Sequence, residues 1–199
     1  MKRNRFYSFA YLVLWPVIHL LFRPVVRGRE RVPAGSAVFC CNHSSNWDPL
    51  VIMITIGYSH QLYALAKAEL SRVPLVGWIL KQAGMIFVER GKADIGAVKA
   101  AMKYLKNGQQ ILIFPEGTRV SEEESAAAKG GVSMLSVRTA SPIVPIYLDS
   151  EKHLFRRVHI VFGEPYVPTV AGRKGTAEEY QNIADEALRR IYRLKEEIR

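Results

Sequence analysis

Cysteine is scarce in this sequence of 199 residues, and the two cysteines present, Cys40 and Cys41, are adjacent. Neighbouring cysteines cannot easily bridge each other, so the sequence predicts no disulfide framework. No set of Cys and His residues has the spacing of a zinc site, so no metal site is predicted. We therefore expect two small core residues in a protein of a reducing compartment.

A long hydrophobic run is also missing. The apolar stretch 6–22 has seventeen residues, which is short for a helix crossing a hydrocarbon core that needs about 20. Pro16 would kink a helix there, and His19 adds a polar group. The pattern favours a helical segment embedded in one leaflet over a full span. It divides the chain into a membrane-associated segment, 1–24, and a single α/β domain, 25–199.

Two other kinds of segment begin in a similar way. A signal peptide has a basic and then apolar start, but no small-x-small cleavage site follows Phe22. A buried core helix is apolar as well, but it would not carry basic residues on both flanks. Because both flanks are basic, the positive-inside rule gives no preferred orientation. A second apolar stretch, 71–80 with Trp78, is open to core packing or to lipid contact.

Acidic residues are rare near the start of the chain. The sequence carries a net charge of +10, and residues 1–31 hold seven Lys or Arg against a single acid, Glu30. The basic excess therefore lies beside the apolar, aromatic segment and not over the whole surface. This arrangement favours an anionic membrane surface as partner and, without any nucleic-acid-binding motif, disfavours nucleic acid.

Short apolar runs alternate with helical patterns along the rest of the chain, without internal repeats. This alternation predicts an α/β fold with a layered, mainly parallel (mixed) sheet flanked by helices. The predicted strands are 37–41, 61–66, 85–88, 110–114, 142–148 and 158–162; the predicted helices begin at Pro49, cover 92–106 and follow a capping box at Thr176–Glu179.

His43 and Asp48 lie in the loop between the first predicted strand and the helix at Pro49. Asp48 occupies the expected N-cap position, with Pro49 as first helical residue. Open α/β sheets place their active sites at such strand ends. A carboxylate beside an imidazole fixes the ring tautomer and stabilises the imidazolium, which makes a general base. The plainer alternative is a loop histidine next to a helix-capping aspartate.

Several cations follow the other predicted strands. Because parallel strands end at one edge of a sheet, we expect them to lie near His43. They suit a phosphate-bearing alcohol, which charge-assisted hydrogen bonds would hold. The candidates are Lys67, Arg90, Arg119, the hydroxyl of Thr118, and Gly117, where the backbone can approach a ligand. Lys67 as a solvated charge and Arg90 as a surface ion pair with Glu89 are the alternatives. Glu116 is either a ligand of the acceptor hydroxyl or a structural anion, and Lys129 is either a flanking residue of the site or part of a plain loop.

Four blocks occur in a fixed order: His43-x4-Asp48, Gly84–Arg90, Phe114–Arg119 and Ile143–Ile146. In that order and at those separations they resemble the glycerolipid acyltransferase family, and within it the bacterial 1-acyl-sn-glycerol-3-phosphate (lysophosphatidic acid) acyltransferases. The likeness runs from about residue 25 to 165. The first and third blocks are specific, whereas the second and fourth are weak alone.

The resemblance implies a reaction and an environment. Family members transfer an acyl group from acyl-CoA or acyl-carrier protein directly to the hydroxyl of a membrane lysophospholipid, without metal or organic cofactor. His43 would be the catalytic base and Asp48 its partner. Glu116, Gly117 and Arg119 match the acceptor-binding block, and Arg90 the second phosphate-contacting block. The product would be phosphatidic acid, and the enzyme would lie on the cytoplasmic face of the cell membrane, monotopic or peripheral.

The sequence departs from the family pattern after Arg119. Val120 stands where serine is usual, and the acidic run Glu122–Glu124 replaces a basic and aromatic stretch. Acids near a phosphate loop weaken anion binding unless they are paired or point away. This leaves open a different lysolipid or a lipid amine as acceptor. A non-enzymatic membrane-binding protein is the alternative from another class, but it leaves His43 and Asp48 unexplained.

Overall fold

The fold is a mixed seven-stranded sheet covered on both faces by helices. A computed structural model describes residues 4–89, 94–120, 128–172 and 175–198. The strand order is β1-β7-β6-β2-β5-β3-β4, and neighbours run parallel except for β6 and β7. The predicted layered, mainly parallel sheet is therefore confirmed. The strands are β1 (Pro24–Arg27), β2 (Ala37–Cys41), β3 (Leu62–Lys67), β4 (Ile86–Val88), β5 (Gln110–Ile113), β6 (Ile143–Leu148) and β7 (Val158–Phe162).

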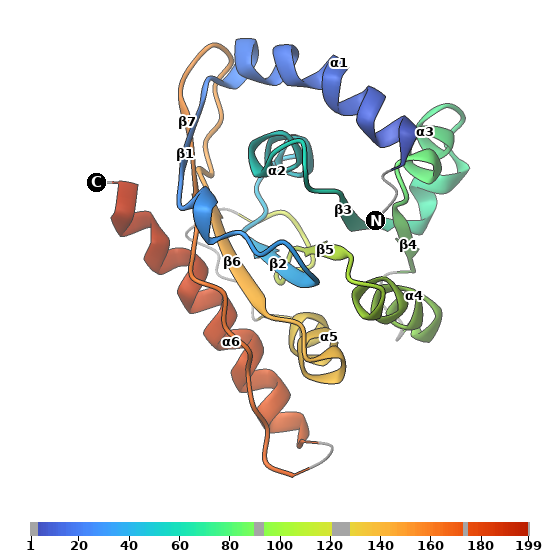
Figure 1. The fold of residues 1–199 in the computed structure, drawn as a ribbon, viewed down its shortest axis with the longest axis vertical. Helices are drawn as coiled ribbons and strands as arrows, with labels where there is room; N and C mark the ends of the chain where they lie inside the picture. The colour runs from blue at the N-terminus through green and yellow to red at the C-terminus, as the bar shows by residue number, and fades with distance from the viewer. Residues whose placement is uncertain (1–3, 90–93, 121–127, 173–174, 199) are drawn as a thin grey trace.

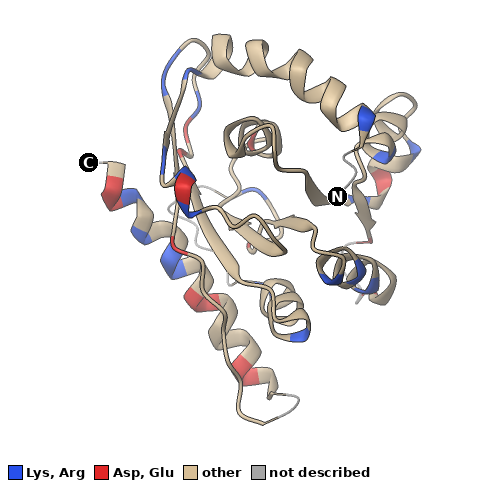
Figure 2. Cartoon of the chain, in the orientation of Figure 1, with Lys and Arg blue, Asp and Glu red and all other residues tan. Residues whose placement is uncertain are grey.

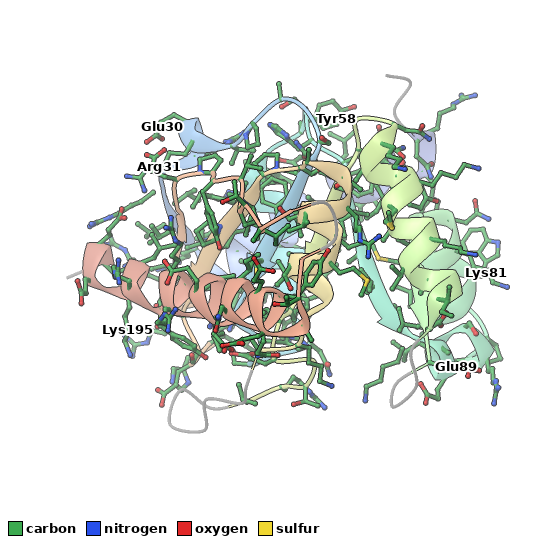
Figure 3. All side chains as sticks on the ribbon, turned by 90° about the horizontal axis from the view of Figure 1, so that it is seen from below. Glu30, Arg31, Tyr58, Lys81, Glu89 and Lys195 are labelled. Atoms are coloured by element: carbon green, nitrogen blue, oxygen red, sulfur yellow. The ribbon has the colours of Figure 1, made fainter. Side chains whose placement is uncertain are left out.

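The helices form two layers. Figure 1 shows α1 and α2 on one face of the sheet and α4, α5 and α6 on the other. Figure 3 looks at the second face from below, with Lys195 beyond α6 at one side and Glu89 after β4 at the other. The helices are α1 (Arg5–Phe22), α2 (Asp48–Ile56), α3 (Val76–Gln82), α4 (Ile95–Lys106), α5 (Gly131–Thr139) and α6 (Ala177–Arg193).

The sheet separates two hydrophobic cores because side chains of a strand alternate between its faces. Phe39 and Cys41 of β2 belong to the core with α1 and α2, whereas Val38 and Cys40 belong to the core with α4, α5 and α6. All five residues of β2 are buried. The central strand is therefore covered on both faces, and only the loop at its end can meet a ligand.

Helix α1 is packed against the domain along its length. Tyr7, Tyr11, Ile18 and Phe22 are buried at intervals that place them on one side of the helix. The Tyr11 hydroxyl donates a hydrogen bond to the carbonyl of Ile54 in α2, at 3.0 Å. Pro16 lies inside the helix, as the sequence indicated. The segment is thus part of the layer over α2 and does not project from the domain.

The other side of α1 is apolar and exposed. Its side chains have no charge between Arg5 and Arg23, as Figure 2 shows. Beside its N-terminal end, Phe6 makes an edge-to-face contact with Trp78 of α3, their ring centroids 5.5 Å apart. The large exposed side chains of α1 are Phe9, Leu12, Val13, Trp15, Val17 and Leu20.

Sequence reasoning missed three short elements. β1 has four residues and pairs with β7. In this pairing Pro24 lies opposite Val158, which is 134 residues later in the chain. Nothing local marks such a strand, because its partner is distant in sequence. α5 and α3 have nine and seven residues, which gives too few turns for a clear helical period. The capping box of Thr176 and Glu179 is present as predicted.

Shortening a side chain should have a large effect on stability at the buried side of α1 and a small effect at its exposed side. Ile18→Ala should destabilise the fold by about 2–5 kcal/mol, because it leaves a cavity in the core. Leu20→Ala, at a side chain that is 63% exposed, should change stability by less than about 0.5 kcal/mol. Chemical denaturation in mild detergent measures both. Equal losses would show that α1 does not keep this docked orientation in solution.

Candidate active site

The central strand delivers His43 to the carboxyl edge of the sheet. Asn42 is buried, and its side chain bonds to both backbone groups of Leu148: its amide donates to the carbonyl at 2.8 Å, and its oxygen accepts from the N–H at 2.9 Å. The side chain therefore acts like one more strand residue and ties the ends of β2 and β6 together. His43 leaves the sheet from this fixed point.

Asp48 holds the loop that follows. One carboxylate oxygen, Oδ2, accepts hydrogen bonds from the backbone N–H groups of Ser44 and Ser45. The same oxygen is within hydrogen-bond distance of the Nδ1 atom of His43, and all three distances are 2.8 Å. The Asp48 side chain is fully buried. A single oxygen atom thus sets both the path of the loop and the position of the imidazole.

This arrangement corrects the predicted capping role of Asp48. The helix begins at Asp48, one residue earlier than expected, and its N-cap is Trp47, which makes no side-chain capping bond. Pro49 follows as the second helical residue. The carboxylate turns back to the loop because the N–H groups of residues 44 and 45 and the imidazole already occupy Oδ2.

The ring of His43 has a defined orientation. Because a carboxylate only accepts, the neutral imidazole must carry its proton on Nδ1, which leaves Nε2 as the acceptor. Phe114 stacks on the ring, with centroids 4.1 Å apart and an angle of 21° between the planes. The His43 side chain is 12% exposed, so the ring is largely covered but reachable. Such a ring can accept a proton at Nε2.

Glu116 supports the backbone of His43. Its Oε2 accepts the His43 N–H at 2.8 Å, and its Oε1 accepts the hydroxyl of Tyr192 in α6 at 2.6 Å. Glu116 is only 1% exposed. Burial raises the pKa of Glu116, against the lowering effect of these two donors. Of the two roles left open by the sequence, this geometry favours the structural anion.

The other carboxylate oxygen of Asp48, Oδ1, has a partner in the segment after β6. The ammonium of Lys152, four residues after β6, lies 2.9 Å from Oδ1 of Asp48, and the Lys152 side chain is 2% exposed. Burial alone would raise the pKa of Asp48. The hydrogen bond with His43, the Lys152 ammonium and the Ser45 N–H together hold that pKa below its usual range.

Gly117 has a positive φ of 70°, and a side chain there would collide with Lys129. A Cβ atom at Gly117 would lie 2.7 Å from the Nζ, Cε and Cδ atoms of Lys129. Lys129 is also held by its backbone N–H, which donates to Pro115. The Lys129 side chain of the same chain thus approaches Gly117 closely, while the approach of a ligand to this glycine stays a prediction. This side chain lies beside the site, as one of its two predicted roles requires.

The remaining candidates differ in how firmly they are placed. Thr118 and Arg119 are exposed, and the next residue, Val120, donates its N–H to the carbonyl of His43 at 2.9 Å. Lys67 is the exposed last residue of β3, at the same edge of the sheet. Arg90 lies outside the described residues, as does the acidic run at 122–124. Within the described ranges, no group of three His, Cys, Asp or Glu side chains is placed to hold a metal.

Sequence reasoning missed Lys152 and Tyr192. Lys152 is a loop lysine between Glu151 and His153, with no pattern to set it apart. Tyr192 reads as part of the periodic face of α6. Both reach the loop around His43 only because β6 and α6 fold next to β2.

The fold and this site define the class of protein. The family described as Acyltransferase matches residues 23–149, well over half of the chain. The chain therefore belongs to the acyltransferase family.

The names of its relatives are more specific than the name of the family. A 1-acyl-sn-glycerol-3-phosphate acyltransferase of Bacillus subtilis is 32% identical over 168 residues, covering 80% of this chain and 81% of that protein. A lyso-ornithine lipid O-acyltransferase of Pseudomonas aeruginosa is 29% identical over 122 residues, 61% of this chain and 46% of that protein. The chain spans about half the length of several other curated relatives.

A solved structure shares the fold. The crystal structure of the 1-acyl-sn-glycerophosphate (LPA) acyltransferase PlsC from Thermotoga maritima superposes with a TM-score of 0.67 and 25% identity, over 96% of this chain and 78% of that one.

The bond between Tyr192 and Glu116 yields a prediction. Tyr192→Phe removes the donor to Oε1 and leaves a buried acceptor short of a partner, which should cost about 1–3 kcal/mol of unfolding free energy. Tyr180→Phe, at a half-buried position of the same helix, is the control and should cost less than about 1 kcal/mol. Urea denaturation followed by circular dichroism measures both. If the two variants have the same stability, the support of Glu116 by α6 is unimportant.

Proposed function

We propose that this chain is a membrane-associated 1-acylglycerol-3-phosphate O-acyltransferase. It would move a fatty acyl group from acyl-CoA or acyl-carrier protein to the free hydroxyl of 1-acyl-sn-glycerol-3-phosphate and give phosphatidic acid. The observation that carries the proposal is the contact of His43 with buried Asp48, at the carboxyl edge of a fold shared with an LPA acyltransferase. The names of several relatives support the same reaction.

The geometry suits direct attack with His43 as general base. Nε2 of His43 takes the proton of the acceptor hydroxyl, while the hydroxyl oxygen forms the new bond to the thioester carbonyl carbon. The carbon–sulfur bond then breaks, and the thiolate leaves with the proton that the imidazolium returns. Asp48 accepts the Nδ1 proton, so that Nε2 is the acceptor nitrogen of the neutral ring, and it stabilises the imidazolium between the two steps.

The cysteines support a mechanism without an acyl-enzyme thioester. Cys40 and Cys41 are the only cysteines in the chain, and both are fully buried within β2. Burial raises the pKa of both thiols far above the ordinary value. Neither thiol is therefore a usable nucleophile, which agrees with the direct transfer of the acyl group proposed here.

We assign the acceptor phosphate to the loop after β5 and its neighbours. Arg119 and Thr118 are exposed next to the segment that pairs with the His43 backbone, and the Lys129 ammonium lies over Gly117. Lys67 and Arg90 are the further cations proposed at this edge. These groups offer the charge-assisted hydrogen bonds that a phosphate monoester needs.

A different acceptor is the second candidate. Val120 and the acids at 122–124 depart from the usual phosphate loop, and one relative is a lyso-ornithine lipid O-acyltransferase. A zwitterionic or amine-bearing lysolipid would tolerate acids near the loop better than a phosphate monoester does. The same base and the same direct transfer would serve it.

Membrane association follows from the two-sided character of α1. One side completes the core, and the other exposes Phe9, Trp15 and Leu20 with their neighbours. Because α1 lies along the domain and crosses over α2 (Figure 1), it would lie in one leaflet with Arg5 and Arg23 at the headgroups. We place residues 1–24 in the membrane-associated segment, 25–199 in the catalytic domain, and the enzyme on the cytoplasmic face, where thioester donors are made.

The base assignment is tested with two histidines. His43→Ala should lower turnover by about 10²–10⁴-fold, measured as thiol release from acyl-CoA and from acyl-carrier protein with lysophosphatidic acid in detergent. His159→Ala is the matched control, because His159 also contacts a carboxylate, that of Asp149 at 3.0 Å. It should retain most of the activity. If only His159→Ala lost activity, His159 with Asp149 and not His43 with Asp48 would be the base pair.

The same assay with lyso-ornithine lipid in place of lysophosphatidic acid separates the two acceptors. Arg119→Ala should raise the apparent KM for lysophosphatidic acid and leave that for the donor unchanged. A change in the donor KM only would contradict the phosphate assignment.

Membrane association is tested on the exposed side of α1. The double variant Leu12→Gln with Leu20→Gln should lower binding to phosphatidylglycerol-containing vesicles at least about tenfold, because two apolar side chains no longer enter the lipid. Ile95→Gln with Met134→Gln, two exposed positions on the α4 and α5 face, is the matched control. Cosedimentation measures both. Equal binding by all three proteins would remove α1 as the lipid contact.

A further inference from the structure

Lys152 is a buried lysine that the reaction described above does not use. Its ammonium lies 2.9 Å from Asp48 Oδ1 and donates to the Ser44 hydroxyl at 2.8 Å and to the backbone carbonyl of Asp149. Only 2% of its side chain is exposed. Lysine is rarely buried this completely without a paired charge. Its partner here is the carboxylate that holds His43.

The two oxygens of Asp48 have different partners. Oδ2 receives three donors from its own loop, namely the imidazole and two backbone N–H groups. Oδ1 has no aligned hydrogen bond within the described residues, and the Lys152 ammonium is the charge beside it. Removing a carboxylate from water is unfavourable unless an opposite charge compensates. Lys152, together with the donors to Oδ2, therefore allows Asp48 to be both buried and ionised.

The cation also acts on the imidazole. An isolated buried carboxylate would favour the protonated ring, because imidazolium and carboxylate together are neutral. With Lys152 present, carboxylate and ammonium already cancel, so proton uptake by His43 leaves a net positive charge inside the protein. A nearby cation thus acts on the imidazole in the opposite direction to the carboxylate.

We propose that Lys152 is a positioning residue that keeps Asp48 ionised and aimed at His43, and that its charge opposes the attraction of the Asp48 carboxylate for an imidazole proton. It acts through Asp48 and does not touch the reacting atoms. The role deepens the proposed function, because it assumes that His43 is the base.

Other charged groups lie near the pair, and they include the cations Lys129, Arg119 and Lys67 at the same edge of the sheet. Glu116 meets the His43 backbone from the loop after β5, and Asp149 meets Lys152 only through its carbonyl, since its carboxylate binds His159. Cys41 lies beneath on β2 as a neutral thiol. Lys152 is therefore the cation in direct contact with Asp48 among the described residues.

The first experiment measures the imidazole directly. We compare Lys152→Met, which keeps the length of the side chain but not its charge, with Lys152→Arg and with Lys106→Met at an exposed position of α4. NMR titration follows His43, assigned by the loss of its signal in His43→Ala. In Lys152→Met the titration midpoint should move up by about one pH unit. Lys152→Arg should move it less, and Lys106→Met should not move it.

Turnover should follow the same charge. The acidic limb of the kcat profile should move to higher pH in Lys152→Met, with a loss of about tenfold well below the titration midpoint and recovery at higher pH. The KM of the acceptor should stay within about twofold. A purely structural tie would lower kcat by the same factor at every pH and leave the NMR midpoint in place, which would overturn the proposal.

A double variant separates positioning from folding. Asp48→Asn leaves the Lys152 ammonium buried without its counter-charge, so this variant should melt at a lower temperature than the double variant Asp48→Asn with Lys152→Met. Equal melting temperatures would show that the pair is not coupled, and the proposal would fail. Because neither melting nor NMR needs turnover, a shifted midpoint with unchanged kcat profile would reject His43 as base while keeping the ion pair.

Discussion

The loop around His43 depends on one buried charge. The Asp48 carboxylate is fully buried and gathers an imidazole, two backbone N–H groups and an ammonium within 2.9 Å. A buried carboxylate is tolerated only with such a set of partners. The partners stabilise the buried charge, and the buried charge in turn holds the partners in place. The histidine, the loop after β2 and the segment after β6 are all fixed by the same group.

The strand order explains why so many segments can reach that charge. β2 lies between β5 and β6, and both neighbours run parallel to it. Parallel strands end at the same edge, so the loops after β5 and β6 lie on either side of His43. The first supplies Glu116 and Phe114, and the second supplies Lys152. The same chemistry at an edge strand would have a neighbour on one side only.

Helix α1 joins the chemistry to its environment. Its buried side completes the core over α2, so the helix cannot leave the domain without exposing Tyr7 and Ile18 to water. Its other side is apolar and uncharged between its two basic ends. In the function proposed here, such a helix would lie flat between protein and lipid, beside an acceptor and a product that stay in the bilayer.

The sequence by itself determined the layered sheet, most of its strands, the capping box of α6 and the pairing of His43 with a carboxylate five residues away. These features are local, because strand alternation, helix caps and a short loop are encoded by residues close together in the chain. The role of Glu116, by contrast, stayed open, since its partner Tyr192 lies 76 residues away. The short strand β1 was missed for the same reason.

Only the tertiary structure decided which charges meet. Lys152 has the same local sequence character as any loop lysine, yet it is buried against Asp48, 104 residues earlier in the chain. Arg119 belongs to one of the two specific blocks, yet its side chain is exposed. Burial and pairing of charges depend on the order in which strands are laid side by side, and that order is set by the packing of the whole sheet. The motif therefore predicts the contact of His43 with Asp48, and the fold adds the ion pair of Asp48 with Lys152.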